Sequence, residues 1–281
     1  MTTQHEKGAI FRDLHLRDET FVIPNPWDAG TAKVLAGLGF KALATTSSGL
    51  AFTLGKSDGV MVVSREEALE NAQAIVAATD LPVSADLENC YADDPAEAAK
   101  TIPMAAAAGL VGCSIEDWSG NPNIGIYDLE LAVDRVRAVC EAARALPFPF
   151  TLTARAENLI RGRNDLQDTI ARLQAYEAAG ADVLYAPGLN DVESIKAVTS
   201  AVGKPVNALA TPGNKHLTVA DFIAGGAKRI SVGGTLARVA TGAFLAGARE
   251  IAEQGRFDHA GNAAAFRDLE ALMRQGAAND N

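Results

Sequence analysis

Apolar and polar positions alternate along this chain in blocks, and the blocks predict strands and helices in turn. Short runs dominated by apolar and small residues are typical of strands that are buried on both faces. The longer stretches between them place apolar residues about 3.6 positions apart, as a helix with one buried face does. The predicted strands are 21–25, 41–46, 82–87, 111–116, 150–155, 182–187, 205–209 and 229–233. The clearest helical stretches are 65–79, 95–108, 128–145 and 165–179.

Small residues mark the points at which several helical stretches end shortly before the next strand. A glycine at such a point can adopt the left-handed conformation that closes a helix. The pairs are Ala36-Gly37, Ala108-Gly109, Ala179-Gly180 and Gly225-Gly226. Eight strands that alternate with helices over about 250 residues predict an α/β fold, a (β/α)₈ TIM barrel. An open doubly wound sheet is the alternative.

No linker, low-complexity block or run of charge divides the chain, so residues 1–281 are predicted to form a single barrel domain. Two further Ala-rich helical stretches, 240–253 and 263–275, follow the last predicted strand. We therefore expect 240–281 to be a C-terminal helical extension that packs on the barrel or on a neighbouring subunit.

Composition narrows the class of protein. The chain has 35 acidic residues against 25 Lys and Arg, a net charge of -10, which argues against nucleic acid or an anionic membrane as a partner. No apolar run approaches the roughly 20 residues that span a bilayer. The polar N-terminus lacks the apolar core of a signal peptide, and three cysteines are too few for a disulfide scaffold. We expect a cytoplasmic protein.

Acidic side chains stand where consecutive predicted strands end. Asp86 and Glu88 close the run V-S-A-D-L-E, and Glu116 and Asp117 close V-G-C-S-I-E-D. The carboxyl ends of parallel strands meet at one rim of a barrel, which is where active sites lie. Asp86 and Glu88 are two positions apart, so both should point to the same face and suit Mg²⁺, with Glu116 completing the set. Asp117 should point the other way and is the weaker candidate.

Arg155 closes the fifth strand in T-L-T-A-R-A-E. Its guanidinium could bind a carboxylate through two hydrogen bonds or stabilise an enolate oxygen. The alternative is an ion pair with Glu157 or Glu116. The sequence argues against several other enzyme classes. Strand six ends without the lysine that a Schiff-base aldolase needs, and no predicted strand end carries a histidine. The sequence has no G-x-S-x-G nucleophile elbow and no dinucleotide-binding fingerprint.

Two further features point to a small anionic ligand. The predicted loop T-T-S-S-G-L-A after strand two should expose the backbone N–H groups of Ser48, Gly49 and Leu50, and such turns can bind a carboxylate or phosphate. Asn207 is polar among apolar neighbours on strand seven, which places it at the barrel mouth.

At these residues the chain resembles the isocitrate lyase and phosphoenolpyruvate mutase superfamily, from about Pro24 to Arg238. The resemblance covers T-S-S-G-L, G-K-S-D-G, D-L-E, S-I-E-D, and R-A-E-N-L-I-R-G followed by R-L-Q-A-Y-E-A-A-G-A-D. It implies a (β/α)₈ barrel, Mg²⁺ or Mn²⁺ as cofactor, and a 2-oxo acid or its enolate as substrate. It also implies a homo-oligomer, a dimer or a tetramer in which C-terminal helices are exchanged between subunits.

Carried over by position, the resemblance assigns roles to individual residues. It implies that Asp86 binds the metal ion and that Arg155 binds the oxyanion of a pyruvate enolate. The implied catalytic residues are Arg155, Asp58 and Glu116. The implied metal site consists of Asp86, Glu88 and Glu116, with Asp58 in the hydration shell. The implied substrate-binding residues are Ser48, Gly49, Leu50, Arg155 and Asn207.

The sequence departs from the superfamily in the loop after strand four. The lyases carry an acid–base cysteine there in K-[KR]-C-G-H, whereas this loop reads W-S-G-N-P-N-I-G-I-Y, without cysteine or lysine. Because decarboxylation needs no base, we predict Mg²⁺-dependent decarboxylation of a small 2-oxo diacid such as oxaloacetate. One alternative is a carbon–carbon lyase on a substituted malate of the 2-methylisocitrate or dimethylmalate type, with Tyr127, Lys215 or His216 as base. The other is a barrel that binds 2-oxo acids without turnover.

Overall fold

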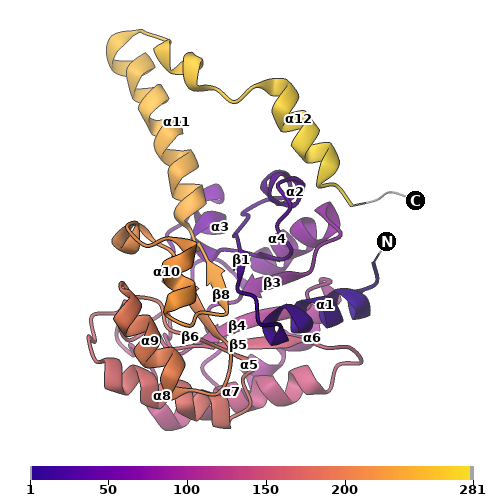
Figure 1. Ribbon diagram of the computed structural model, residues 1–281, viewed down its shortest axis with the longest axis vertical. Helices are drawn as coiled ribbons and strands as arrows, with labels where there is room; N and C mark the ends of the chain where they lie inside the picture. The colour runs from indigo at the N-terminus through magenta and orange to yellow at the C-terminus, as the bar shows by residue number, and fades with distance from the viewer. Residues whose placement is uncertain (1, 279–281) are drawn as a thin grey trace.

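A computed structural model describes residues 2–278, and within them eight parallel strands form one sheet that curves into a barrel (Figure 1). The sheet order is β1-β8-β7-β6-β5-β4-β3-β2. The seam between β1 and β2 is joined by the backbone of Ala44, whose N–H donates to the carbonyl of Pro24 at 3.1 Å. The strands are β1 (Phe21–Ile23), β2 (Leu43–Ala44), β3 (Val83–Asp86), β4 (Gly112–Glu116), β5 (Thr151–Arg155), β6 (Val183–Tyr185), β7 (Val206–Leu209) and β8 (Arg229–Ser231).

Each observed strand lies inside the run that predicts it, so the (β/α)₈ barrel is confirmed and the open sheet is excluded. Helices surround the strands. They are α1 (Gln4–Leu16), α2 (Ala29–Gly37), α3 (Ser47–Thr53), α4 (Arg65–Ala78), α5 (Pro95–Ala99), α6 (Thr101–Ala107), α7 (Leu129–Arg144), α8 (Leu166–Ala178), α9 (Val192–Ala201), α10 (Val219–Ala224), α11 (Thr235–Gln254) and α12 (Phe266–Gln275), with short 3₁₀ turns η1 (Pro212–Asn214) and η2 (Asp258–Asn262).

The predicted helix 95–108 is two helices, α5 and α6, which meet at Lys100. Pro103 explains the break. A proline inside a helix has no N–H to donate, and its ring collides with the carbonyl four residues earlier, here that of Ala99. The helical spacing of the apolar residues continues through the break, which is why the periodicity alone predicts one element.

Helix α1 packs against the end of the barrel at which the strands begin. Phe11 is fully buried in a cluster with Leu14, Ile23 and Val111. No strand or helix is predicted before residue 21, so this helix is an addition to the sequence-based picture.

The inside of the barrel contains a polar network in place of the branched apolar side chains that usually fill it. Arg229 donates from Nε to Asn207 Oδ1 at 2.8 Å and from Nη2 to Thr153 Oγ1 at 3.1 Å. Its Nη1 lies 3.3 Å from Nε2 of His15, whose Nδ1 lies 2.8 Å from the carbonyl oxygen of Phe11. Because that carbonyl can only accept, Nδ1 carries the proton and Nε2 accepts from Arg229. The network joins α1 to three strands.

Burial, together with the charge of Arg229, lowers the pKa of His15 from 6.5 to about 3, and Lys228 adds a smaller repulsion. The folded protein therefore keeps His15 neutral down to about pH 3, whereas the unfolded chain protonates it below about pH 6.5. Because the unfolded state binds the extra proton, this residue makes the protein less stable as the pH falls from 6.5 towards 3. The expected slope is about 1.4 kcal/mol per pH unit.

We predict that His15→Gln removes this part of the acid sensitivity. Glutamine does not titrate and can still accept a hydrogen bond. Between pH 6.5 and 5, wild type should lose about 2 kcal/mol more unfolding free energy than the variant in urea titrations. His5→Gln, an exposed position, is the matched control and should follow wild type. Parallel curves for wild type and His15→Gln would contradict the prediction.

The C-terminal helices extend away from the barrel and return (Figure 1). Helix α11 begins at Thr235, five residues before the predicted stretch, and α12 packs on α2. The contact needs glycine at position 37, because a side chain there would overlap the carbonyl of Leu272. Exposed apolar side chains on α11 include Val239 and Phe244. Within residues 2–278 no helix is both long and apolar enough to cross a membrane. That residues 1–281 form a single domain stays a prediction.

Candidate active site

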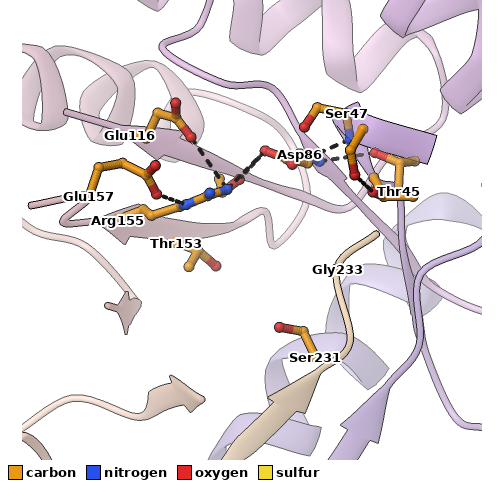
Figure 2. A network of polar contacts seen from close by, with 12 residues as sticks. Thr45, Ser47, Asp86, Glu116, Thr153, Arg155, Glu157, Ser231 and Gly233 are labelled. Carbon is orange, nitrogen blue, oxygen red and sulfur yellow. Dashed lines mark hydrogen bonds and ion pairs between the residues drawn. The ribbon is translucent and has the colours of Figure 1, made fainter. Parts of the chain in front are cut away.

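Three of the predicted site residues are the last residues of consecutive strands. Asp86 ends β3, Glu116 ends β4 and Arg155 ends β5, and Glu116 is the register partner of Arg155. Arg155 Nη1 lies 3.4 Å from Asp86 Oδ1 and 3.3 Å from Glu116 Oε2, and its Nε pairs with Glu157 (Figure 2). The expected convergence on one rim of the barrel is therefore present.

Arg155 is held by carboxylates on three sides. Burial alone would lower its pKa, but Glu157, then Glu116, and more weakly Asp86 raise it well above its ordinary value. The guanidinium also lies over the ring of Tyr185, 5.0 Å from its centre. The ion pairs with Glu157 and Glu116 that the sequence offers as the alternative role are present together with the contact to Asp86.

Asp58 and Glu88 add negative charge next to Asp86. Burial and the charge of Asp86 raise the pKa of Asp58. Burial, then Asp86 and Asp58, raise the pKa of Glu88 to about 7. The same-face argument for Glu88 does not apply, because β3 ends at Asp86 and Glu88 has a φ of 48°. The turn that follows brings Glu88 close to Asp86 instead, and non-glycine residues with positive φ often mark functional sites.

A cavity of about 150 Å³ opens between these strand ends and the interior of the barrel. Its charged lining residues are Asp58, Asp86, Arg155 and Arg229. A separate void of about 10 Å³, about the size of one water molecule, adjoins Asp86 and Glu88. The main cavity is smaller than the usual drug-sized pocket, so it suits a metabolite of few atoms.

The residues present fit a hard divalent cation. Mg²⁺ uses carboxylate oxygens and keeps several waters, so one or two direct carboxylates are sufficient. Among residues 2–278, no group of three or more Asp, Glu, His or Cys side chains is arranged to hold a metal ion, yet Oε2 of Glu88 is buried without a hydrogen-bond partner. An unpaired buried carboxylate oxygen beside Asp86 and a water-sized void is consistent with a hydrated ion held mainly by Asp86.

The segment after β2 is a helix, α3, and not the expected loop, and this changes its donors. Thr46 caps the helix: Gly49 donates to its Oγ1 at 3.3 Å and Leu50 to its carbonyl at 3.1 Å. Ser47 N–H donates to Asp86 Oδ2 at 3.4 Å. Two of the three expected backbone donors are therefore used inside the helix. Ser48 lines the cavity, whereas Gly49 and Leu50 do not.

Asn207 lines the cavity as expected, but its side chain is already engaged. Its Oδ1 accepts from Arg229, and its Nδ2 donates to Ser231 Oγ at 2.9 Å. Asp117 points away from the cavity to the helices, where Arg172 Nη1 lies 3.0 Å and Tyr176 OH 2.6 Å from Oδ2. It stabilises the packing of α8 on the barrel.

Sequence reasoning missed Arg229 and Tyr185, which line the cavity from β8 and β6. The signal for Arg229 was a polar position two residues before Ser231 in the apolar run R-I-S-V-G, because alternate residues of a strand point to the same face. None of the alternative bases lines the cavity in the described part of the chain. Tyr127 is buried and donates to Asp93, and Lys215 and His216 lie elsewhere.

The chain is similar to known proteins over most of its length. The family described as phosphoenolpyruvate phosphomutase matches residues 11–252. A solved structure from Burkholderia cenocepacia J2315, described as a candidate lyase/mutase, is 52% identical, with a TM-score of 0.91 and 95% of each chain covered. An oxaloacetate decarboxylase of Chromohalobacter salexigens is 27% identical over 76% of this chain and 74% of its own. A 2-methylisocitrate lyase of Escherichia coli is also 27% identical, over 74% of this chain and 71% of its own.

Proposed function

The chain belongs to the phosphoenolpyruvate phosphomutase family of lyases and mutases, and on that premise we propose that it decarboxylates a small 2-oxo diacid such as oxaloacetate with the help of Mg²⁺. The observation that carries the proposal is the juxtaposition of Asp86 and Arg155, 3.4 Å apart, at a cavity that also contains Asp58. An acid cluster for a cation and a guanidinium for a developing oxyanion thus share one small space.

Each residue has a defined task in this reaction. Asp86 would hold the metal ion, and Glu88, Glu116 and Asp58 would lie near enough to accept hydrogen bonds from its water molecules. The ion, when bound, withdraws electrons from the 2-oxo group. The C3–C4 bond breaks and CO₂ leaves. The electron pair of that bond forms the C2=C3 double bond, and the π pair of the carbonyl moves to the 2-oxo oxygen to give the enolate. Arg155 faces the oxygen that gains charge, and solvent then protonates C3.

In the described residues 2–278, none of the three alternative bases, Tyr127, Lys215 and His216, lines the cavity. This favours decarboxylation over cleavage of a substituted malate, which requires deprotonation of a hydroxyl. Tyr185 is the tyrosine that lines the cavity, and burial raises its pKa to about 12. Burial likewise raises the pKa of Tyr127 to about 12. Neither phenol is ionised near pH 7, so neither is a ready acceptor of a proton.

The test is an assay of the purified protein with Mg²⁺ and a panel of 2-oxo diacids. We expect release of CO₂ and pyruvate from oxaloacetate above the rate of the metal ion alone, and loss of this release with EDTA. Turnover of substituted malates instead would support the carbon–carbon lyase. Tight binding of oxalate without turnover of any compound would support a non-catalytic binding protein, and either result would overturn the proposal.

We further propose that the protein is a cytoplasmic, single-domain homo-oligomer, a dimer or tetramer in which the C-terminal helices contact neighbouring subunits. The support is the exposed apolar face of α11 beside a groove that is lined by Trp27, Phe52 and Phe244. Light scattering of the purified protein measures the oligomeric state directly.

A further inference from the structure

The turn that follows β3 has a strained backbone. Three of the four residues 88–91 are not glycine and yet have a left-handed conformation, with φ of 48° at Glu88, 57° at Cys90 and 60° at Tyr91. This conformation costs free energy for a residue with a Cβ atom, and it persists only where surrounding contacts hold it. The contacts around this turn therefore decide its shape.

The strained turn lies next to the acid cluster. It begins two residues after Asp86, and its Glu88 and Tyr91 line the water-sized void together with Asp86. Oε2 of Glu88 is buried without a hydrogen-bond partner. Strained backbone conformations gather at functional sites, where they place a side chain that relaxed backbone could not place. Whatever holds the turn consequently determines where the carboxylate of Glu88 lies.

A buried arginine on α7 holds the turn from outside. Arg135 is 1% exposed, and its Nη2 donates to the carbonyl oxygens of Asn89 and Ala92, to the latter at 2.8 Å. Its Nη1 donates to the carbonyl oxygen of Glu116 at 3.3 Å. One guanidinium thus joins both halves of the turn to the end of β4, which carries the next acid of the cluster.

The acceptors of Arg135 are main-chain atoms and not acids. Within residues 2–278, no carboxylate forms an ion pair with it, and its guanidinium lies over the ring of Tyr127, 4.2 Å from the centre. Hydrogen bonds from a charged donor are stronger than those from a neutral one, and the planar fork reaches several carbonyls at once. Arg135 therefore fixes the shape of the backbone.

Asn89 and Tyr127 add side-chain contacts to the same turn. Oδ1 of Asn89, which is buried, accepts from the N–H of Tyr91 at 2.9 Å, and its Nδ2 donates to the hydroxyl of Tyr127 at 3.0 Å. The hydroxyl of Tyr127 in turn donates to Asp93. Tyr127, which the sequence offers as a base, is thus engaged with the turn.

We propose that Arg135 is a positioning residue for the metal site, because its hydrogen bonds hold residues 88–92 in the turn that sets Glu88 beside Asp86. The inference rests on the proposed function for the presence of a divalent cation. Mg²⁺ keeps several water molecules, and the carboxylates that accept from those waters need fixed places. Arg135 does not line the cavity, so it should govern affinity for the ion and not the chemical step.

The first test is Arg135→Lys. Lysine keeps the charge but cannot span the carbonyls of Asn89, Ala92 and Glu116 together. In calorimetric titrations without substrate, the Kd for Mg²⁺ should rise at least about tenfold. The Mg²⁺ concentration that gives half of the full rate should rise in parallel, whereas kcat at saturating Mg²⁺ should stay within about threefold of wild type. An unchanged Kd would contradict the proposal.

A control variant separates positioning from a general loss of stability. Ile195→Ala removes a fully buried side chain from α9, which packs on β7. It should also lower the melting temperature, because it leaves a cavity in the core. Its Kd for Mg²⁺ should stay within about twofold of wild type, since the change is distant from the turn. A similar rise of the Kd in both variants would mean that Arg135 serves stability alone.

Hydrogen exchange follows the turn itself, without metal or substrate. The N–H groups of Cys90 and Tyr91 donate to Leu87 and Asn89. In EDTA, wild type should protect both from exchange, and Arg135→Lys should exchange them at least about tenfold faster. Exchange in wild type at the rate of an unfolded peptide would refute the proposal. Should Arg135→Lys fail to fold, Arg135→Met leaves no buried charge and should show the same rise in Kd.

The outcomes distinguish this inference from the proposed function. If affinity for Mg²⁺ depends on Arg135 but no 2-oxo diacid is decarboxylated, the proposed function is wrong and the role of Arg135 stands. If oxaloacetate is decarboxylated and Arg135→Lys keeps the wild-type Kd for Mg²⁺, the role of Arg135 is wrong. A wild-type protein that binds no Mg²⁺ would refute both.

Discussion

Replacement of Asp86 by asparagine is expected to lower Mg²⁺-dependent activity at least about a thousandfold, which corresponds to about 4 kcal/mol of transition-state stabilisation. Asn removes the charge of the one strand-end carboxylate that lines both the main cavity and the water-sized void. Without it, the remaining acids lack the central ligand around which a hydrated ion could be held. Steady-state rates over a range of Mg²⁺ concentrations measure the loss.

The fold should tolerate this change. Asp86 accepts long hydrogen bonds of 3.3 to 3.4 Å from Ser114, Ser47 and Arg155, and its charge raises the pKa of both Glu88 and Asp58. Removal of that repulsion offsets the lost contacts, so the melting temperature in EDTA should change little. Asp134→Asn, the same substitution at an exposed position, is the control and should keep full activity. Wild-type activity of Asp86→Asn would refute the metal assignment.

Replacement of Arg155 by lysine is expected to lower kcat at least about a hundredfold, in the range seen when one oxyanion donor is removed. The fork of Arg155 pairs through Nε with Glu157 and through Nη1 with Asp86 and Glu116. A lysine ammonium is a single point of charge and cannot keep these three contacts and also face a substrate oxygen. The position of the charge is lost although the charge is kept.

The comparison variant is Arg137→Lys, an exposed arginine that pairs with Asp134 three residues earlier on α7. It should retain wild-type kcat and KM. Circular dichroism and thermal unfolding should show that Arg155→Lys is folded, since Lys can still pair with one of the three acids. Full kcat in folded Arg155→Lys would mean that the arginine serves the structure alone.

Local patterns were sufficient to predict the barrel and the rim. The eight strands are short apolar runs, and the positions of Asp86, Glu116 and Arg155 at strand ends follow from the point at which each run stops. The break in helix 95–108 could also have been predicted from the sequence, because Pro103 lies inside it. The helical spacing of the apolar residues continues through Pro103, and the prediction of one helix followed that spacing.

What the sequence could not provide depends on contacts between distant segments. The turn that brings Glu88 to Asp86 requires a positive φ at Glu88, and the presence of a glutamate in the sequence does not predict that conformation. The use of the Gly49 and Leu50 N–H groups depends on whether Thr46 caps a helix. The contact of Arg229 with His15 can be seen only when the strands and α1 are placed together.

Helix α1 packs under the barrel, and its His15 contacts Arg229, which lines the cavity. The first segment of the chain is therefore linked to the cavity through one imidazole. A shortened chain without residues 4–16 would remove the acceptor at His15 Nε2, and it would uncover Ile23 and Val111, which pack with Phe11 and Leu14. Water could then approach the guanidinium of Arg229, which lines the cavity, from the side that α1 now covers. Trimming the amino-terminal end would therefore loosen the polar network inside the barrel, although every residue of the rim would still be in place.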